Sequence, residues 1–141
     1  MQRDKIVFAG VLLSLLAGSA VAAPPTPKQV VDHHIGALQK ADIDQLVQDY
    51  APNAVVVLSI GTFSGLVQIR KMFETYFEQD KDNTHSAWDA SAEPKPNGLV
   101  VEHWTFYRGQ QRENSGTDII VVRNGKIVFH SMGPDAACKS K

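Results

Sequence analysis

The sequence predicts an α+β domain in which three N-terminal helices pack on a curved, mainly antiparallel sheet. In the first half, Thr26 and Asp42 begin two helix-capping patterns, and apolar residues follow each of them at helical spacing. In the second half, β-branched and aromatic segments alternate with turn signals, of which Asn124-Gly125 is the strongest hairpin signal. Helices that precede a run of antiparallel strands are typical of the α+β class.

The start of the chain has the features of a secretory signal peptide. Arg3 and Lys5 are basic, residues 6–16 are apolar, and Ala20-Val21-Ala22 supplies the small residues of a cleavage site. The apolar run is shorter than the roughly 20 residues that a membrane-spanning helix needs, and an uncleaved anchor is the alternative interpretation. We expect residues 1–22 to be removed, leaving residues 23–141 as one periplasmic or secreted domain without membrane contact.

Composition narrows the classes of partner. The chain has 14 basic and 15 acidic residues, and without residues 1–22 it keeps 12 and 14. A net charge of about −2 gives no reason to expect nucleic acid or an anionic membrane as a partner. Cys138 is the only cysteine, so neither a disulfide within the chain nor a multi-cysteine zinc site is available.

Two helices are predicted at the start of the domain. Thr26 suits the N-cap, Pro27 suits the first helical position, and Gln29 completes a capping box. The apolar face of this first helix consists of Val30, Val31, His34, Ala37, Leu38 and Ala41. Asp42 begins the second helix, which Pro52-Asn53 ends.

A strand, a tight turn and a third helix are predicted next. Residues 54–59 are β-branched and read as a strand, Gly61 and Gly65 bracket a tight turn, and residues 66–77 have the spacing of an amphipathic helix. The later strands are predicted at residues 84–91, 99–107, 117–122 and 127–132, with Arg108-Gly109 as a second hairpin signal. Residues from Gly133 onward are expected to form a loose tail.

The first half of the domain also resembles a known family. Its segments Asp42-Ile43-Asp44-Gln45, Pro52-Asn53 and Gly61-Thr62-Phe63-Ser64-Gly65 follow the order helix, strand, tight turn, helix. This order resembles the SnoaL-like and ketosteroid-isomerase-like branch of the nuclear transport factor 2-like superfamily, over residues 34–132. The resemblance implies a cone-shaped fold, a cystatin-like roll, with one deep cavity for a small hydrophobic molecule. Since the superfamily uses this cavity for unrelated purposes, the fold leaves the activity open.

The resemblance allows a test for steroid isomerase activity. Ketosteroid isomerases use a carboxylate base together with a tyrosine and a protonated aspartic acid that bind the oxyanion. In this sequence Leu58 matches the base, His34 matches the tyrosine, and Asp118 matches the aspartic acid. Because leucine cannot accept a proton, the match argues against steroid isomerase activity. It leaves a histidine–aspartate pair, which dehydratases of this fold also use.

The site residues follow from the strand register of the resembling fold, in which alternate residues face the cavity. The expected catalytic residues are Asp118, His103, His130 and His34, and the expected ligand-binding residues are Val56, Leu58, Val101, Thr105, Ile120 and Met132. A histidine held by a buried aspartate suits general acid–base catalysis near neutral pH. The alternatives are that His34 is a core histidine, and that a one-residue shift of register turns His103 or His130 outward.

No metal and no cofactor are expected. His34, His103, His130 and Asp118 are ligand types that suit a divalent ion, but no local metal-binding motif is present, and the adjacent His33 and His34 diverge on a helix. On the register given above, Trp104 and Phe106 face outward. An aromatic outer sheet face predicts a homodimer through that face.

Three functions fit these features. The first is an exported enzyme with histidine–aspartate acid–base chemistry of the isomerase, dehydratase or cyclase type, acting on a small hydrophobic molecule. The second is a non-catalytic periplasmic binding module with the same cavity, and the third is a dimerisation module. Asp118 and the predicted cavity histidines favour the first two over the third, and whether a reaction is catalysed is left open.

Overall fold

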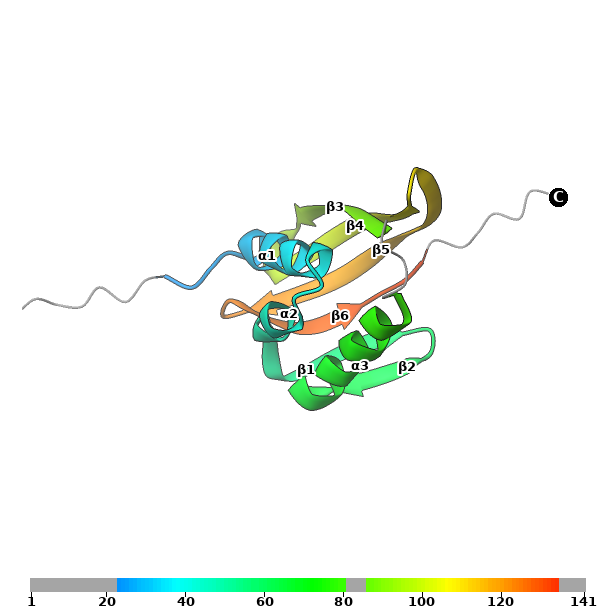
Figure 1. Ribbon diagram of the computed structural model, residues 1–141. Coiled ribbons are helices and arrows are strands. Elements are labelled where there is room, and N and C mark those ends of the chain that lie inside the picture. The colour runs from blue at the N-terminus through cyan, green and yellow to red at the C-terminus, as the bar shows by residue number, and fades with distance from the viewer. Residues whose placement is uncertain (1–22, 81–85, 135–141) are drawn as a thin grey trace, which may run out of the picture.

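The described residues form two layers, with three helices on one face of a six-stranded sheet (Figure 1). The computed structural model describes residues 23–80 and 86–134. The helices are α1 (Pro27–Gln39), α2 (Ile43–Gln48) and α3 (Gly65–Asp80). The strands are β1 (Tyr50–Leu58), β2 (Gly61–Ser64), β3 (Ser86–Pro94), β4 (Leu99–Arg108), β5 (Gln111–Arg123) and β6 (Lys126–Ser131), with a short 3-10 turn η1 (Pro96–Gly98) before β4. The predicted fold class is confirmed.

The sheet has the order β2-β1-β6-β5-β4-β3. Its neighbouring strands are antiparallel except for β1 and β6, which are parallel. Helix α1 lies over the part of the sheet that contains β3, β4 and β5, and α3 lies along β1 and β2 (Figure 1). The space for a cavity is therefore bounded by the sheet on one side and by two separate helices on the other.

The helix starts agree with the sequence patterns. The Thr26 side chain accepts a hydrogen bond from the Gln29 amide, and the Gln29 side chain accepts one from the Thr26 amide, which completes the predicted capping box. Asp42 caps α2 through the Gln45 amide. These caps satisfy amide groups that a helix start otherwise leaves unpaired, so both helices begin where local chemistry favours it.

Some boundaries differ from the prediction. Strand β1 begins at Tyr50 rather than at residue 54, and the predicted tight turn between Gly61 and Gly65 is the short strand β2. Strand β5 begins at Gln111 rather than at residue 117. The signal peptide, the predicted strand start at residue 84 and Cys138 lie outside the described residues.

The residues after β6 are held against the sheet rather than loose. The Gly133 carbonyl accepts a hydrogen bond from the Thr117 amide at 3.0 Å, and Pro134 forms a bridge with Gly116. This part of the predicted tail is therefore corrected, and residues 135–141 lie outside the description.

The core lies between the helices and the sheet. Its fully buried apolar residues include Val31, Leu46, Ala54, Val56, Ile69, Val100, Ile120 and Ile127. Burying each large side chain contributes about 1.5–3 kcal/mol, so this layer anchors the strands whose polar residues face the cavity. Within residues 23–80 and 86–134, no helix has both the length and the apolar character needed to cross a membrane.

A β-bulge in the β4–β5 hairpin sets which β4 residues face the helices. Near the turn, Tyr107 pairs with Arg112, but the next pair is Phe106 with Asn114, so Glu113 is left without a partner in the ladder. The extra residue shifts the register by one, and Glu102 lies opposite Asp118. Residues that are directly opposite in an antiparallel pair point to the same face.

The bulge overturns the predicted orientation of β4. Without it, the hairpin would place Val101, His103 and Thr105 on the face of Asp118, as the sequence analysis expected. With it, Glu102, Trp104 and Phe106 take that face, since a one-residue shift exchanges the two faces of a strand.

Candidate functional site

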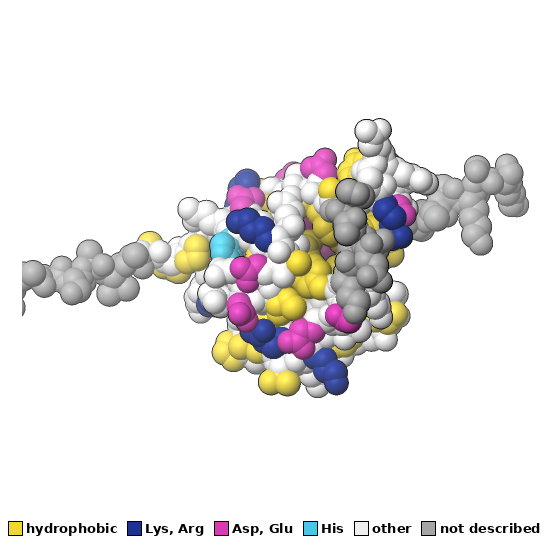
Figure 2. Space-filling model, in the orientation of Figure 1, with side chains coloured by type: hydrophobic (Ala, Val, Ile, Leu, Met, Phe, Trp, Pro, Cys, Tyr) yellow, Lys and Arg dark blue, Asp and Glu magenta, His cyan; other side chains and the backbone are white. Residues whose placement is uncertain are grey.

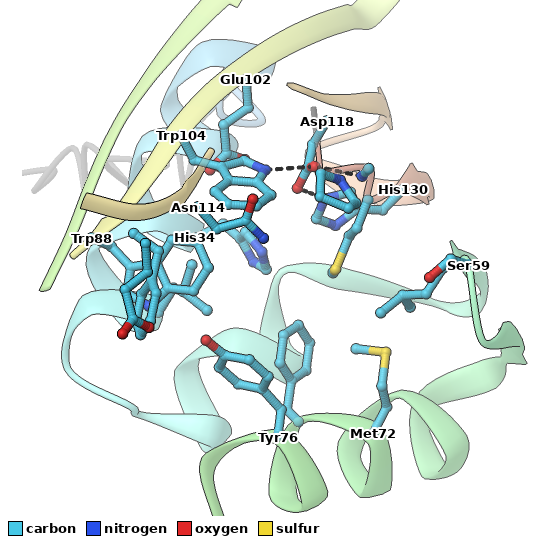
Figure 3. Close-up of a pocket in the computed structure, with 18 of the residues that line it drawn as sticks. His34, Ser59, Met72, Tyr76, Trp88, Glu102, Trp104, Asn114, Asp118 and His130 are labelled. Carbon is cyan, nitrogen blue, oxygen red and sulfur yellow. Dashed lines mark hydrogen bonds and ion pairs between the residues drawn. The ribbon is translucent and has the colours of Figure 1, made fainter. Parts of the chain in front are cut away.

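A cavity of about 610 Å³ lies between the helices and the sheet. Most of its wall is apolar or aromatic, and in Figure 2 hydrophobic side chains gather in the middle of this face, bordered by charged ones. The aromatic wall consists of Phe73, Tyr76, Trp88, Trp104 and Phe106. The cavity also has a polar corner, which we define as Glu102, Asp118 and His130 with His34 beside them (Figure 3).

Asp118 and His130 form a hydrogen-bonded pair in the polar corner. His130 Nε2 lies 3.1 Å from Asp118 Oδ2, and both side chains are buried. The Tyr50 hydroxyl lies 2.7 Å from His130 Nδ1. Because a carboxylate only accepts, this pattern assigns the proton to Nε2 and makes Nδ1 the acceptor of the tyrosine proton. Both ring nitrogens of His130 are thus engaged within the protein.

The second oxygen of Asp118 is held by two further donors. Trp104 Nε1 donates to Oδ1 at 2.8 Å, and the Gly133 amide donates to the same atom at 3.1 Å. Asp118 therefore receives hydrogen bonds from three places in the chain, one of which is a cavity-lining indole.

Glycine at position 116 makes room for this indole. Gly116 lies opposite Trp104 on β5, and a Cβ atom there would lie 2.3 Å from the Trp104 ring and 2.3 Å from the Gly133 carbonyl oxygen. No side chain fits in that space, so the glycine is part of the arrangement that directs Trp104 toward Asp118.

Glu102 has a buried carboxyl oxygen to which no described residue forms a hydrogen bond. It is only 2% exposed, and its Oε2 atom is buried without a hydrogen-bond partner among the described residues. Burial, with a smaller contribution from the Asp118 charge, raises the pKa of Glu102 to about 8. In the free protein at neutral pH, Glu102 is therefore protonated.

His34 borders the polar corner from α1. It is buried, and its Nδ1 lies 3.8 Å from Asp49 Oδ2, which is too far for a hydrogen bond. Burial, followed by the charges of His130 and His33, lowers the pKa of His34 well below its usual value. The imidazole is therefore neutral near pH 7.

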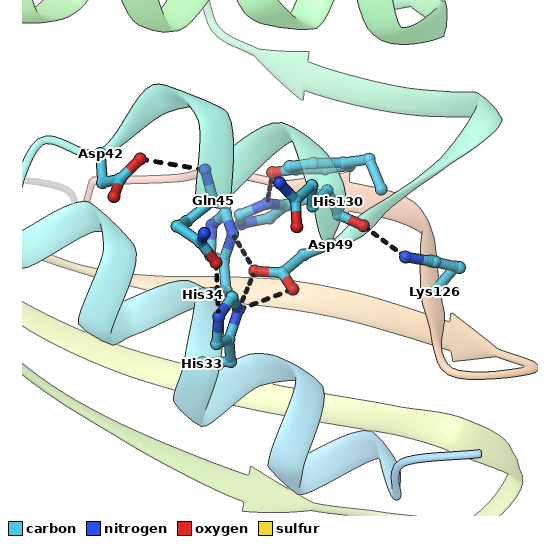
Figure 4. A network of polar contacts seen from close by, with 9 residues as sticks. His33, His34, Asp42, Gln45, Asp49, Lys126 and His130 are labelled. Carbon is cyan, nitrogen blue, oxygen red and sulfur yellow. Dashed lines mark hydrogen bonds and ion pairs between the residues drawn. The ribbon is translucent and has the colours of Figure 1, made fainter. Parts of the chain in front are cut away.

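The Asp49 carboxylate is instead hydrogen-bonded to His33, the exposed neighbour of His34 in the sequence (Figure 4). His33 Nδ1 lies 2.8 Å and 2.9 Å from the two Asp49 oxygens, and His33 Nε2 lies 3.1 Å from Gln45 Oε1. Burial raises the pKa of Asp49 despite the opposing effect of His33. Burial also raises the pKa of Tyr50, and the charges of Glu102, Asp118 and Asp49 add to this shift.

The polar corner contains the types of atom that bind divalent cations. One ligand-type atom each from Glu102, Asp118 and His130 lies within 4.8 Å of the others. However, Asp118 Oδ2 and His130 Nε2 are hydrogen-bonded to each other, so an ion would have to displace that bond. The four metal ligands considered from the sequence are not brought together, because His103 lies on the other face of β4.

The structure assembles part of the predicted site. Asp118, His130, His34, Leu58 and Met132 line the cavity, while Val56 and Ile120 are buried in the adjoining core. His130 and Asp118 are in contact as predicted.

The prediction was wrong for three residues of β4. The β-bulge places Val101, His103 and Thr105 on the face of the sheet opposite to Asp118, so they do not share its side of β4. His103 is exposed there, with its Nδ1 3.1 Å from Thr117 Oγ1. Trp104 and Phe106 line the cavity instead, so they do not form the aromatic outer face on which the homodimer prediction was based.

Sequence reasoning missed Glu102, Tyr50 and the hydrogen bond from Trp104. Tyr50 was assigned to the second helix, although it is the first residue of β1. For Glu102, the available signal was its position on the same strand face as the apolar residues Val100 and Phe106. That signal indicates the cavity only if the bulge is known.

Comparisons with known proteins agree with this fold. A family model of the SnoaL-like domain matches residues 31–130. No curated protein matches the chain. A solved structure from Methylobium petroleophilum PM1, a protein of unknown function with a cystatin-like fold, superposes with a TM-score of 0.64 at 17% identity, covering 82% of this chain and 81% of that one.

Two further solved structures carry functional descriptions. One from Agrobacterium tumefaciens, described as a "putative isomerase of the SnoaL-like family", has a TM-score of 0.62 and 16% identity, covering 77% of this chain and 96% of that one. One from Sinorhizobium meliloti, described as a "putative polyketide cyclase", has a TM-score of 0.59 and 16% identity, covering 74% and 94%. At these identities the likeness shows the fold alone.

Proposed function

This chain belongs to the SnoaL-like domain family, and we propose that it is an exported enzyme that binds a small, largely apolar molecule in its cavity and performs acid–base chemistry on it. The observation that carries the proposal is the position of Asp118. Its carboxylate lines the cavity and is held by donors from His130, Trp104 and Gly133. A carboxylate fixed in this way is a preorganised proton acceptor.

The shape and wall of the cavity support a small substrate. A volume of about 610 Å³ with a mostly apolar wall and one polar corner is typical of small-molecule sites. Asp118 is the group that would meet the reacting atoms. His130 and Tyr50 act as positioning residues, because His130 donates to the Asp118 carboxylate and the Tyr50 hydroxyl holds the His130 ring.

The names of the structural neighbours are consistent with this chemistry. Isomerases and cyclases that act next to a carbonyl group both move a proton to or from carbon.

The second candidate function is a binding module, in which the same cavity holds a ligand without catalysing a reaction. One observation favours it. Both ring nitrogens of His130 are already engaged, so the histidine has no free nitrogen for a substrate.

The test follows hydrogen–deuterium exchange at the carbons beside the carbonyl in a panel of mono- and bicyclic ketones, by proton NMR in D₂O. The wild type should accelerate exchange in at least one ketone, and Asp118→Asn should remove at least nine-tenths of the acceleration. Asp89→Asn, an exposed change on β3, is the matched control. Binding of the panel, detected by saturation-transfer NMR, without accelerated exchange would favour the binding module.

Export is a separate part of the proposal and rests on the basic start, apolar run and cleavage pattern of residues 1–22. Mass spectrometry of the protein recovered from a bacterial host that secretes it should give a chain that begins at Ala23. A chain that begins at Met1 would contradict the predicted cleavage.

A further inference from the structure

We propose that the cavity takes an organic cation, a protonated amine attached to an apolar body, with Glu102 as the residue that binds the ammonium group. This inference rests on the proposed function and names the class of its substrate. It assigns a role to Glu102, which the acid–base proposal does not use.

The buried oxygen Oε2 of Glu102 is available to a ligand. Tyr50, His130, Trp104 and Asp118 already form a continuous chain of hydrogen bonds. In contrast, Glu102 Oε2 is buried, faces the same corner and has no hydrogen-bond partner among the described residues. A buried polar atom without a hydrogen-bond partner destabilises the protein, and a donor supplied by a ligand would remove this destabilisation.

The charged residues of the cavity wall are mainly acidic. Its described lining residues include three acidic ones, Glu102, Asp118 and Glu113, and one Lys or Arg residue, Arg108. Arg108 is already ion-paired with Glu113 at 3.0 Å. The groups that face Glu102 are Asp118 from β5, His130 from β6, His34 from α1 and Tyr50 from β1, and none of them supplies a lysine or arginine cation. A buried carboxylate in such surroundings favours a cationic ligand.

The aromatic wall lies beside the Glu102 carboxyl group. Trp104 is two residues from Glu102 on the same strand face, and Trp88 packs against both Trp104 and Phe106 with ring centroids 5.2 Å and 5.0 Å apart. Faces of tryptophan and phenylalanine attract ammonium groups, and the attraction strengthens when water is excluded. The same rings can pack against the apolar part of the ligand.

The proposal has a protonation signature. Glu102 is protonated in the free protein because its pKa is raised to about 8, and it must ionise to pair with an ammonium group. Binding then releases one proton, so the affinity for an amine should rise about tenfold for each pH unit below 8 and level off above it. A neutral ligand of the same shape releases no proton and should show no such rise.

The experiment compares 2-phenylethylamine with 2-phenylethanol, which has the same apolar body without the charge. Titration calorimetry of the full mature chain is carried out at pH 6, 7 and 8 with EDTA present. At pH 8 the amine should bind at least tenfold more tightly than the alcohol, and this preference should decrease as the pH is lowered. Glu102→Gln should remove both this preference and its pH dependence. Glu74→Gln, an exposed change on α3 outside the cavity wall, should keep both.

Three results would overturn the inference. These are equal binding of amine and alcohol by the wild type, an unchanged preference in Glu102→Gln, and binding of Zn²⁺ alone that the amine displaces and Glu102→Gln abolishes. The last result would assign the polar corner to a metal ion. If neutral ketones still exchange deuterium in an Asp118-dependent manner, the proposed function stands although this inference fails. A circular dichroism spectrum confirms that each variant is folded.

Discussion

At the scale of single residues, the polar corner divides its groups into paired and unpaired ones. Asp118 and His130 satisfy each other, whereas Glu102 has a buried oxygen without a partner among the described residues. The two carboxyl groups lie opposite each other on β4 and β5, and the Asp118 charge adds to the burial that raises the pKa of Glu102. Most of the chemistry proposed above follows from this difference between two neighbouring acids.

The raised pKa of Glu102 makes the stability of the protein depend on pH. The folded state keeps this proton up to about pH 8, whereas the ordinary value is 4.5. Between these values the folded state binds more protons, so the free energy of unfolding should fall as pH rises through this window. The fall attributable to Glu102 is about 1.4 kcal/mol per pH unit.

Urea denaturation of the wild type and of Glu102→Gln at pH 5.5, 7 and 8.5 checks this. The variant should lose less stability than the wild type as pH rises, because glutamine cannot ionise. Glu74→Gln, an exposed change on α3, should follow the wild type. Parallel pH profiles of wild type and Glu102→Gln would show that Glu102 is not a buried acid.

At the scale of elements, local capping and turn patterns explain the success of sequence-based prediction, and the β4–β5 hairpin explains its failure. Capping patterns at Thr26 and Asp42 and the turn at Asn124-Gly125 depend on neighbouring residues only, and they located the helices and the last hairpin. The bulge at Glu113 has no comparable local signature in this sequence. Its consequence is large, since it replaces His103 by Glu102 and Trp104 in the cavity.

Gly116→Ala tests how the hairpin positions the Trp104 indole. The new methyl group would meet the Trp104 ring and the Gly133 carbonyl oxygen, each at 2.3 Å. We expect a loss of about 1–3 kcal/mol in the free energy of unfolding, typical of overpacking, together with a shifted tryptophan emission spectrum.

Gly36→Ala is the matched control for that change. Gly36 lies inside α1, and a Cβ atom there would have no described atom within 4 Å beyond the adjacent backbone of its own helix. Because alanine is the better helix former, this substitution should stabilise the protein by about 0.5–1 kcal/mol. Destabilisation by Gly36→Ala and none by Gly116→Ala would contradict the packing described here.

At the scale of the whole molecule, the α+β class and the helix-on-sheet arrangement were predictable, because hydrophobic periodicity and caps repeat along the chain. The site was predictable only in part. Asp118 and His130 were found from the resemblance and from alternation along β5 and β6, whereas Glu102 depended on the strand register. The homodimer through the outer sheet face remains a prediction, but Trp104 and Phe106 do not carry it, since they line the cavity.

Sedimentation equilibrium separates the oligomeric state from the role of Trp104. The wild type and Trp104→Phe should have the same molecular mass in solution at micromolar concentration, because the changed ring lies inside the cavity and donates to Asp118. The variant should instead lose stability, as Asp118 loses a donor. A dimeric wild type together with a monomeric Trp104→Phe variant would contradict this position and would place Trp104 in the dimer interface.

The measurement that tests the central claim most directly is a ¹³C NMR titration of the glutamate side-chain carboxyl carbons, with Glu102 assigned by comparison with Glu102→Gln. The claim is that Glu102 is buried in the cavity beside Asp118. The account predicts that the Glu102 resonance titrates with a pKa of about 8. A resonance that titrates near the ordinary value of 4.5 would place Glu102 in solvent and would contradict both the register of β4 and the site built on it.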